Sequence, residues 1–162
     1  MIKAEDLRIG DLVRVSCNCS LAEGTIGTIV EISKETNAED TKGFVRLIPI
    51  NSISNYGWGI YCDNIEGIPL TPEILEKNGW KRDKLVSYIY GHDAHNIEVI
   101  CTPNSEWMCV TFKGDTIHRI KYVHELQHIL WALGLDANIK IQTKSNKILK
   151  TKKQWKQTSE RK

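Results

Sequence analysis

The sequence predicts a mainly β protein of the α+β class, built from a small β-barrel and a small antiparallel sheet packed with two helices. Three observations support this prediction. The first 65 residues hold short segments rich in Val and Ile that are bounded by Gly, Asn, Asp and Ser, as strands are. A second group of such segments follows, and helix start and stop signals flank it on both sides. We therefore expect a barrel over residues 1–68, an α+β domain over 69–137 and a basic tail over 138–162.

Four strands are expected in the first region, at residues 11–17, 25–33, 43–50 and 57–65. A closed barrel is favoured because closure removes the unpaired edges of short strands. The spacing IGDLVRV…EGTIGTIVEI resembles the KOW-type opening of SH3-like barrels, where a Gly-Asp turn precedes the first strand and a Gly-x-x-Gly turn enters the second. The resemblance implies an SH3-like barrel that binds RNA or other proteins, and the acidic character of this segment disfavours RNA.

The second region is expected to begin with a helix over residues 71–78. Thr71 suits the N-cap and Pro72 suits the first helical position. Asn78 and Gly79 supply the residues at which helices commonly stop.

Antiparallel strands are expected within residues 84–112, where apolar positions alternate between turn signals. Their expected ranges are 84–91, 96–102 and 106–112. A long amphipathic helix should follow over residues 117–134 and stop near Gly134. Residues 137–143 are a candidate for a short final strand.

The string HELQH, from His124 to His128, spells the zinc-peptidase signature H-E-x-x-H. On a helix, histidines at i and i+4 share one face and can bind one zinc ion, while the glutamate between them activates a metal-bound water. A zinc hydrolase also needs a third protein ligand. No Glu occurs between residues 126 and 159 and no His follows His128, so the downstream chain does not complete a known pattern.

The helical wheel favours a structural interpretation of this string. Val123, Leu126 and Leu130 fall on the apolar arc, whereas His124 and His128 border the polar face. We therefore expect the helix to pack on the sheet and the signature to be coincidental. His124 and His128 remain the candidate metal ligands, and we expect no catalytic residue and no cofactor.

A second group of soft ligands consists of His92, His95, Cys101 and Cys109. A hairpin turn at residues 103–104 would place the two thiols on opposite faces of the sheet, which favours structural cysteines over a metal site. The five cysteines are odd in number and lack the dense framework of a small secreted fold, so we expect reduced thiols.

Three segments, DLRIGDLV, IPLTPEILEKNGW and IKYVHELQHILWAL, are similar to an uncharacterised family of small gut-bacterial proteins. Many members are encoded on phage-like or other mobile elements, and the resemblance spans most of residues 4–135. Members end in a helix of the form KYVHELQNLYFAL, with Asn usual at the position of His128 and Gln frequent at that of Glu125. The resemblance implies a helix that does not depend on metal ligation, and it implies no established activity.

Composition excludes a helical membrane protein. The 162 residues are 41% hydrophobic and 26% charged, as in ordinary soluble domains, and no apolar run approaches the roughly 18 residues that a spanning helix needs. The first residues, MIKAEDLRIGDLV, carry acids and lack the apolar stretch of a signal peptide. We expect a cytoplasmic protein with no membrane partner.

The function that we expect is non-enzymatic: a binding or adaptor protein of a phage-like or mobile element, whose partner is another protein. The absence of a complete catalytic constellation in the sequence favours it. Tyr56, Trp58 and Tyr61 are candidates for an exposed recognition surface, and packing in the core or loops is the alternative.

Nucleic-acid binding through the basic tail is the alternative function. From residue 138 onward nine Lys or Arg stand against one acid, a net charge of +8, whereas residues 1–137 carry −6. The tail lysines could neutralise phosphates, and Trp155 could stack on an unpaired base. The candidate lysines are Lys144, Lys147, Lys150, Lys152, Lys153 and Lys156.

Overall fold

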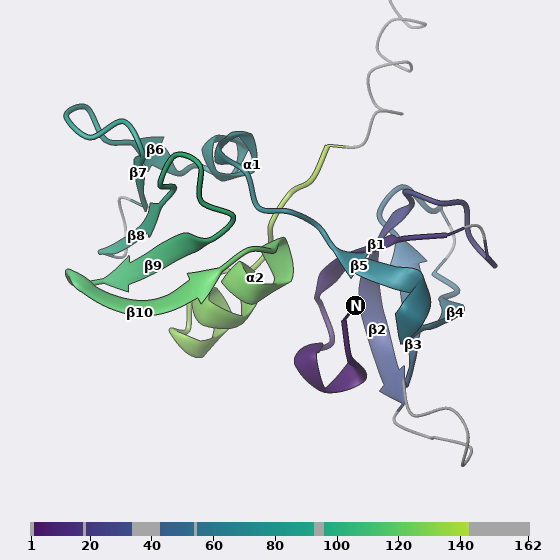
Figure 1. The fold of residues 1–162 in the computed structure, drawn as a ribbon. Coiled ribbons are helices and arrows are strands. Elements are labelled where there is room, and N and C mark those ends of the chain that lie inside the picture. Colours follow the sequence, from purple (N-terminus) through teal and green to yellow (C-terminus); the bar gives the residue numbers. More distant parts are fainter. Residues whose placement is uncertain (1, 18, 34–42, 54, 93–95, 143–162) are drawn as a thin grey trace, which may run out of the picture.

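The computed structural model describes residues 2–17, 19–33, 43–53, 55–92 and 96–142 (Figure 1). In this part of the chain, two antiparallel five-stranded sheets are accompanied by two α-helices and two short 3-10 helices. The predicted class, mainly β within α+β, is therefore confirmed. No helix of the described residues is long and apolar enough to span a membrane.

The first sheet has the strand order β4-β3-β2-β1-β5. Its strands are β1 (Leu12–Val15), β2 (Ile26–Ser33), β3 (Phe44–Pro49), β4 (Trp58–Tyr61) and β5 (Ile65–Gly67). The segment predicted as one strand over 57–65 is divided by the 3-10 helix η2 (Cys62–Asn64), which turns the chain from β4 onto β1.

The closed barrel that we expected is not present in the described strand pairing. β4 and β5 stand at opposite ends of the strand order, and β5 pairs with β1 through all three of its residues. The core of the sheet is completed instead by the segment around the 3-10 helix η1 (Ala4–Asp6). Ile2, Ala4 and Leu7 from that segment are buried with the strand residues. The N-terminal segment, and not closure of the strands into a barrel, therefore covers the core.

The second sheet has the order β10-β9-β8-β7-β6. Its strands are β6 (Lys81–Arg82), β7 (Ile89–His92), β8 (Ile97–Ile100), β9 (Met108–Phe112) and β10 (Asp115–Ile120). β7 begins later than the expected residue 84 because Asp83 Oδ1 accepts hydrogen bonds from the amides of Leu85 and Val86, both at 2.7 Å, and folds that segment into a turn.

The expected helix start at residue 117 is wrong, because residues 115–120 form β10. Lys113 and Gly114 have φ values of 52° and 90°, and Phe112 pairs with Asp115 across them. Two consecutive residues with positive φ make the tight turn whose twist matches antiparallel strands, so the chain returns as a strand. The helix proper, α2 (Val123–Ala132), starts six residues later than predicted.

Both helices begin with a side-chain cap, and the one at Thr71 was predicted. In α1 (Pro72–Lys77), Thr71 Oγ1 accepts from Ile74 N at 3.4 Å. At the start of α2, Glu125 Oε2 accepts from the amides of Lys121 (2.6 Å) and Tyr122 (2.8 Å). The carboxylate thus satisfies backbone donors at the positive end of the helix.

α2 lies between the two sheets (Figure 1). Its residues Val123, Leu126 and Leu130 are buried against the second sheet, as the wheel predicted. The same core also includes Leu12 and Ile26 of the first sheet. Residues 137–142 form no strand, although Ile139 within them is buried.

Candidate functional site

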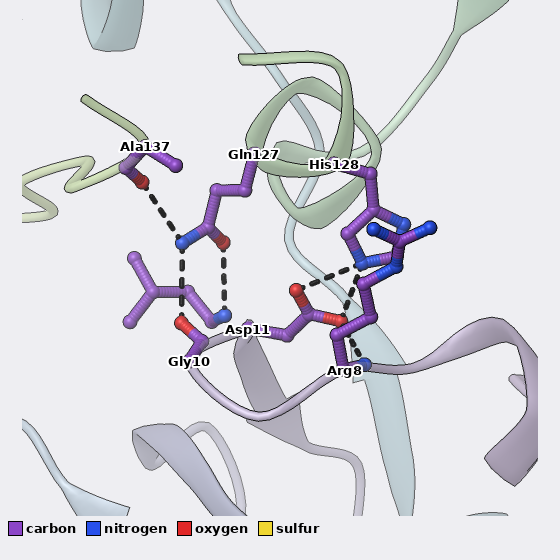
Figure 2. A network of polar contacts seen from close by, with 7 residues as sticks. Arg8, Gly10, Asp11, Gln127, His128 and Ala137 are labelled. Atoms are coloured by element: carbon purple, nitrogen blue, oxygen red, sulfur yellow. Dashed lines mark hydrogen bonds and ion pairs between the residues drawn. The ribbon is translucent and has the colours of Figure 1, made fainter. Parts of the chain in front are cut away.

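Gln127 joins α2 to the loop before β1. Its Oε1 accepts from Leu12 N at 3.0 Å, and its Nε2 donates to the carbonyls of Gly10 and Ala137, both at 3.2 Å (Figure 2). The side chain is 7% exposed. All three contacts are to backbone groups, so this amide replaces secondary-structure pairing where the two halves of the chain meet.

His128 of α2 makes a second contact to the same loop, through Asp11. His128 Nε2 lies 2.9 Å from Asp11 Oδ1 and 2.8 Å from Oδ2, while Asp11 Oδ2 also accepts from Arg8 N at 2.7 Å (Figure 2). Asp11 is 3% exposed. A carboxylate this deeply buried is stabilised by its donors, so these two residues fix the loop against the helix.

His124 occupies a different environment from the one that the wheel predicts. It is 3% exposed, and its ring stacks on that of Tyr122 with centroids 5.7 Å apart and planes 10° apart. Burial lowers the pKa of His124 below its ordinary value of 6.5, although the negative charges of Asp11, Glu125 and Asp6 oppose that shift.

The placement at the border of the polar face is therefore corrected for His124, which is 3% exposed, whereas the His128 side chain is 22% exposed. On this side of α2, Asp11 in the loop before β1 contacts His128. Glu125 Oε2 already accepts the two backbone amides at the helix start, and His128 Nε2 already contacts Asp11, so neither atom is available to a metal ion. Among the described residues no group of three or more His, Cys, Asp and Glu is placed to hold a metal ion.

The outer face of the first sheet carries a hollow of about 600 Å³ over β2, β3 and β4. We call it the outer-face hollow; its lining is Val30, Glu31, Phe44, Arg46, Ile48, Asn55, Tyr56, Gly57 and Gly59. Two glycines make its floor possible. A Cβ on Gly57 would lie 2.2 Å from Arg46 Cγ, and one on Gly59 would lie 2.2 Å from Phe44 Cζ. The side chains of Arg46 and Phe44 therefore pack directly against the backbone of Gly57 and Gly59.

Phe44 and Tyr56 line the outer-face hollow, and Tyr61 lies beside Phe44. Tyr56 is 85% exposed and Tyr61 is 54% exposed, and the Tyr61 ring meets Phe44 edge-on with centroids 5.8 Å apart. Trp58 is 47% exposed, but it pairs with the buried Leu47, so its side chain projects from the opposite face of the sheet. The structure thus places all three aromatic candidates on or beside β4 with large exposed fractions, and the alternative of core packing is wrong for Tyr56.

Sequence reasoning missed the other parts of this surface. Phe44 and Arg46 belong to a strand that was predicted, but nothing in the strand pattern distinguishes its outer face from its inner one. The signal that was present is the glycine pair in Tyr56-Gly57-Trp58-Gly59, because glycine inside a strand indicates close approach of a neighbouring group.

The remaining candidates divide into two groups. Cys101 contacts Met108 Sδ at 3.4 Å, and burial raises its pKa to about 11, as expected of a structural thiol. His95 and the candidate residues of the basic tail lie outside the described residues; the latter are Lys144, Lys147, Lys150, Lys152, Lys153, Trp155 and Lys156.

Comparison with protein families, curated proteins and solved structures finds no match to this chain.

Proposed function

We propose that this is a non-enzymatic protein-binding module, and that the outer-face hollow takes an extended segment of another protein. The observation that carries the proposal is the exposure of aromatic side chains around a glycine-floored hollow on an edge strand. Exposed Tyr and Trp provide large contact areas at low conformational cost, and aromatic-lined grooves are a recurring means of binding extended peptides. The family resemblance supports an origin on a phage-like or mobile element.

The chemistry of the hollow indicates what kind of segment fits. Val30, Phe44 and Ile48 offer apolar contacts, and the pair Arg46–Glu31, 3.1 Å apart, offers one polar group of each sign. Both members of that pair are about half exposed, so the ion pair contributes little to stability and can exchange its partners. The surface therefore suits an extended segment with apolar side chains and few charges.

Selection from a phage-displayed library of random linear peptides tests this proposal. Selected peptides are then titrated into the labelled protein and followed by amide and methyl NMR shifts. Val30, Phe44 and Ile48 should shift most. Tyr56→Ala should weaken binding at least tenfold, a loss of about 1.4 kcal/mol. Tyr88→Ala is the matched control, because Tyr88 is 42% exposed and belongs to no part of the hollow. Equal affinities for the two variants would refute the proposal.

Nucleic-acid binding through the basic tail remains a second candidate, favoured by the charge of +8 from residue 138 onward. Single-stranded DNA binding is measured by fluorescence anisotropy as a function of salt. Replacing the six candidate lysines with Gln should lower affinity and reduce the slope of log K against log salt by about 0.7 for each phosphate that is no longer neutralised. An unchanged slope would remove this candidate.

A further inference from the structure

A second hollow opens between η1 and the first turn of α2. Its volume is about 440 Å³. We call it the α2 hollow; its lining is Ile2, Glu5, Asp6, Arg8, Tyr122, His124, Glu125 and His128. It therefore combines residues from the N-terminal segment with residues of α2, and it shares no lining residue with the outer-face hollow.

Negative charge predominates in this lining. Glu5, Asp6 and Glu125 bring three carboxylates, and Arg8 brings the one guanidinium. That guanidinium lies over the Trp131 ring, 4.9 Å from its centroid, toward the C-terminal half of α2. Lys3 contacts Glu5 at 3.1 Å, but both side chains are mostly exposed, so a ligand can displace this ion pair at little cost.

His124 supplies an independent indication of a ligand. It is 3% exposed, lines the hollow, and has no hydrogen-bond partner for Nδ1 among the described residues. Buried polar atoms are nearly always hydrogen bonded, because leaving one without a partner costs free energy. The neighbouring rings of Tyr122 and His128 contact His124 through their aromatic surfaces and do not remove this cost.

The electrostatics of His124 indicate the sign of that ligand. Asp11, Glu125 and Asp6 all favour a positive charge at the imidazole, yet burial outweighs them and lowers the pKa of His124. The imidazole is therefore neutral at pH 7, and a neutral imidazole presents one acceptor nitrogen. His128 does not supply a hydrogen bond to His124, because its Nε2 is directed at Asp11. A cation bound in the hollow would supply the missing positive charge.

We propose that the α2 hollow binds a protonated alkylamine, held by the carboxylates of Glu5, Asp6 and Glu125 and by the imidazole of His124. An ammonium group donates three separate hydrogen bonds and can use acceptors that are spread apart. A metal ion needs its ligands close together, and the described residues hold no such group. Ile2 and Tyr122 provide apolar contacts for the alkyl chain. A free amine and a lysine side chain of a partner share this chemistry.

NMR titration of the full chain at constant ionic strength tests the proposal. The probes are 1,4-diaminobutane, for a free amine, and acetyl-Gly-Lys-Gly-amide, for a lysine side chain. Saturable shifts of the His124 ring protons and the Glu125 amide are expected with at least one probe. The tighter probe identifies the source of the amine. The double variant Glu5→Gln/Asp6→Asn should bind at least tenfold more weakly, whereas Glu76→Gln, an exposed carboxylate on α1, should bind as the native chain does.

Three results would overturn the proposal. The first is no saturable shift with either probe. The second is an equal shift with 1,4-butanediol, which has the same length and no charge. The third is a Zn²⁺ titration that saturates the same resonances when neither amine does, because that would make the hollow a metal site. His124→Asn should also weaken binding. Because His124 is buried, this variant can fail to fold, and the variants at the exposed carboxylates then decide the outcome.

Discussion

Asp11 and His128 join the loop before β1 to the middle of α2. The His128 Nε2 atom lies 2.8 Å from Asp11 Oδ2, and Asp11 also accepts the amide of Arg8 at 2.7 Å. Because the carboxylate is 3% exposed, it depends on both donors in place of water. One buried side chain therefore holds the shape of the loop and its attachment to the helix.

This relationship predicts energetic coupling between the two residues. Asp11→Ala and His128→Asn, made singly and together, should give a coupling free energy of about 0.5–3 kcal/mol in urea unfolding. A control cycle combines Asp11→Ala with His118→Asn, since His118 is exposed on β10. Coupling as small as in the control cycle would contradict the contact.

Gln127 should matter more to stability than a polar residue on an amphipathic helix usually does. Gln127→Ala leaves the buried Leu12 N–H without its acceptor, which should lower the free energy of unfolding by about 1–3 kcal/mol. Gln142→Ala removes the same atoms from an exposed position and should change it by less than about 0.5 kcal/mol. Both are measured by urea unfolding. Similar midpoints for the two variants would show that the Gln127 hydrogen bonds add no stability.

Much of the fold follows from local pattern, and the exceptions have local causes. α1 has the cap at Thr71 and the stop at Gly79 that its sequence predicts. β10 was missed because Lys113-Gly114 lacks the Asn or Asp that usually marks a tight hairpin. Its residues Thr116 and Ile117 are β-branched, which is the signal that favours a strand there.

Hydrophobic periodicity does not predict which polar side chains of α2 have buried partners. A wheel identifies the apolar face that packs on one sheet, and Val123, Leu126 and Leu130 were assigned correctly in this way. His124 borders the polar face on the wheel, yet it is buried because residues from more than a hundred positions earlier lie beside it. Gln127 falls within the apolar arc, and its amide accepts a hydrogen bond from Leu12 N, 115 positions earlier. Only tertiary contacts such as Asp11–His128 contain that information, since a polar residue looks alike in sequence whether it meets water or a buried partner.

The buried His124 predicts how stability changes with pH. Its pKa is lowered in the folded state, so the unfolded chain binds more protons once the pH falls below the ordinary histidine value of 6.5. This contribution to stability is complete above that pH and is lost progressively below it, with a slope of at most about 1.4 kcal/mol per pH unit. The measurement is urea unfolding between about pH 5 and pH 8. His124→Gln should reduce the slope below pH 6.5 and His118→Gln should not; equal slopes in the two variants would contradict the assignment.

Gly67 in β5 should tolerate no side chain, because the Tyr122 ring lies against it. A Cβ at this position would approach Tyr122 Cγ to 2.4 Å and Cδ1 to 2.6 Å. The ring cannot move away easily, since it also stacks on His124, and the backbone beside it is held by the bond from Val123 N to Ile68 O at 2.9 Å.

Gly67→Ala should therefore lower the free energy of unfolding by about 1–3 kcal/mol, the usual cost of overpacking. The matched control is Gly91→Ala in β7, where a Cβ meets no atom within 4 Å. That substitution should be neutral or slightly stabilising, because alanine restricts the unfolded chain more than glycine does. Thermal and urea unfolding measure both variants. The His124 ring resonances should also shift in Gly67→Ala and stay unchanged in Gly91→Ala, because displacement of Tyr122 alters the stacked pair; a destabilised variant with unchanged resonances would place the strain elsewhere.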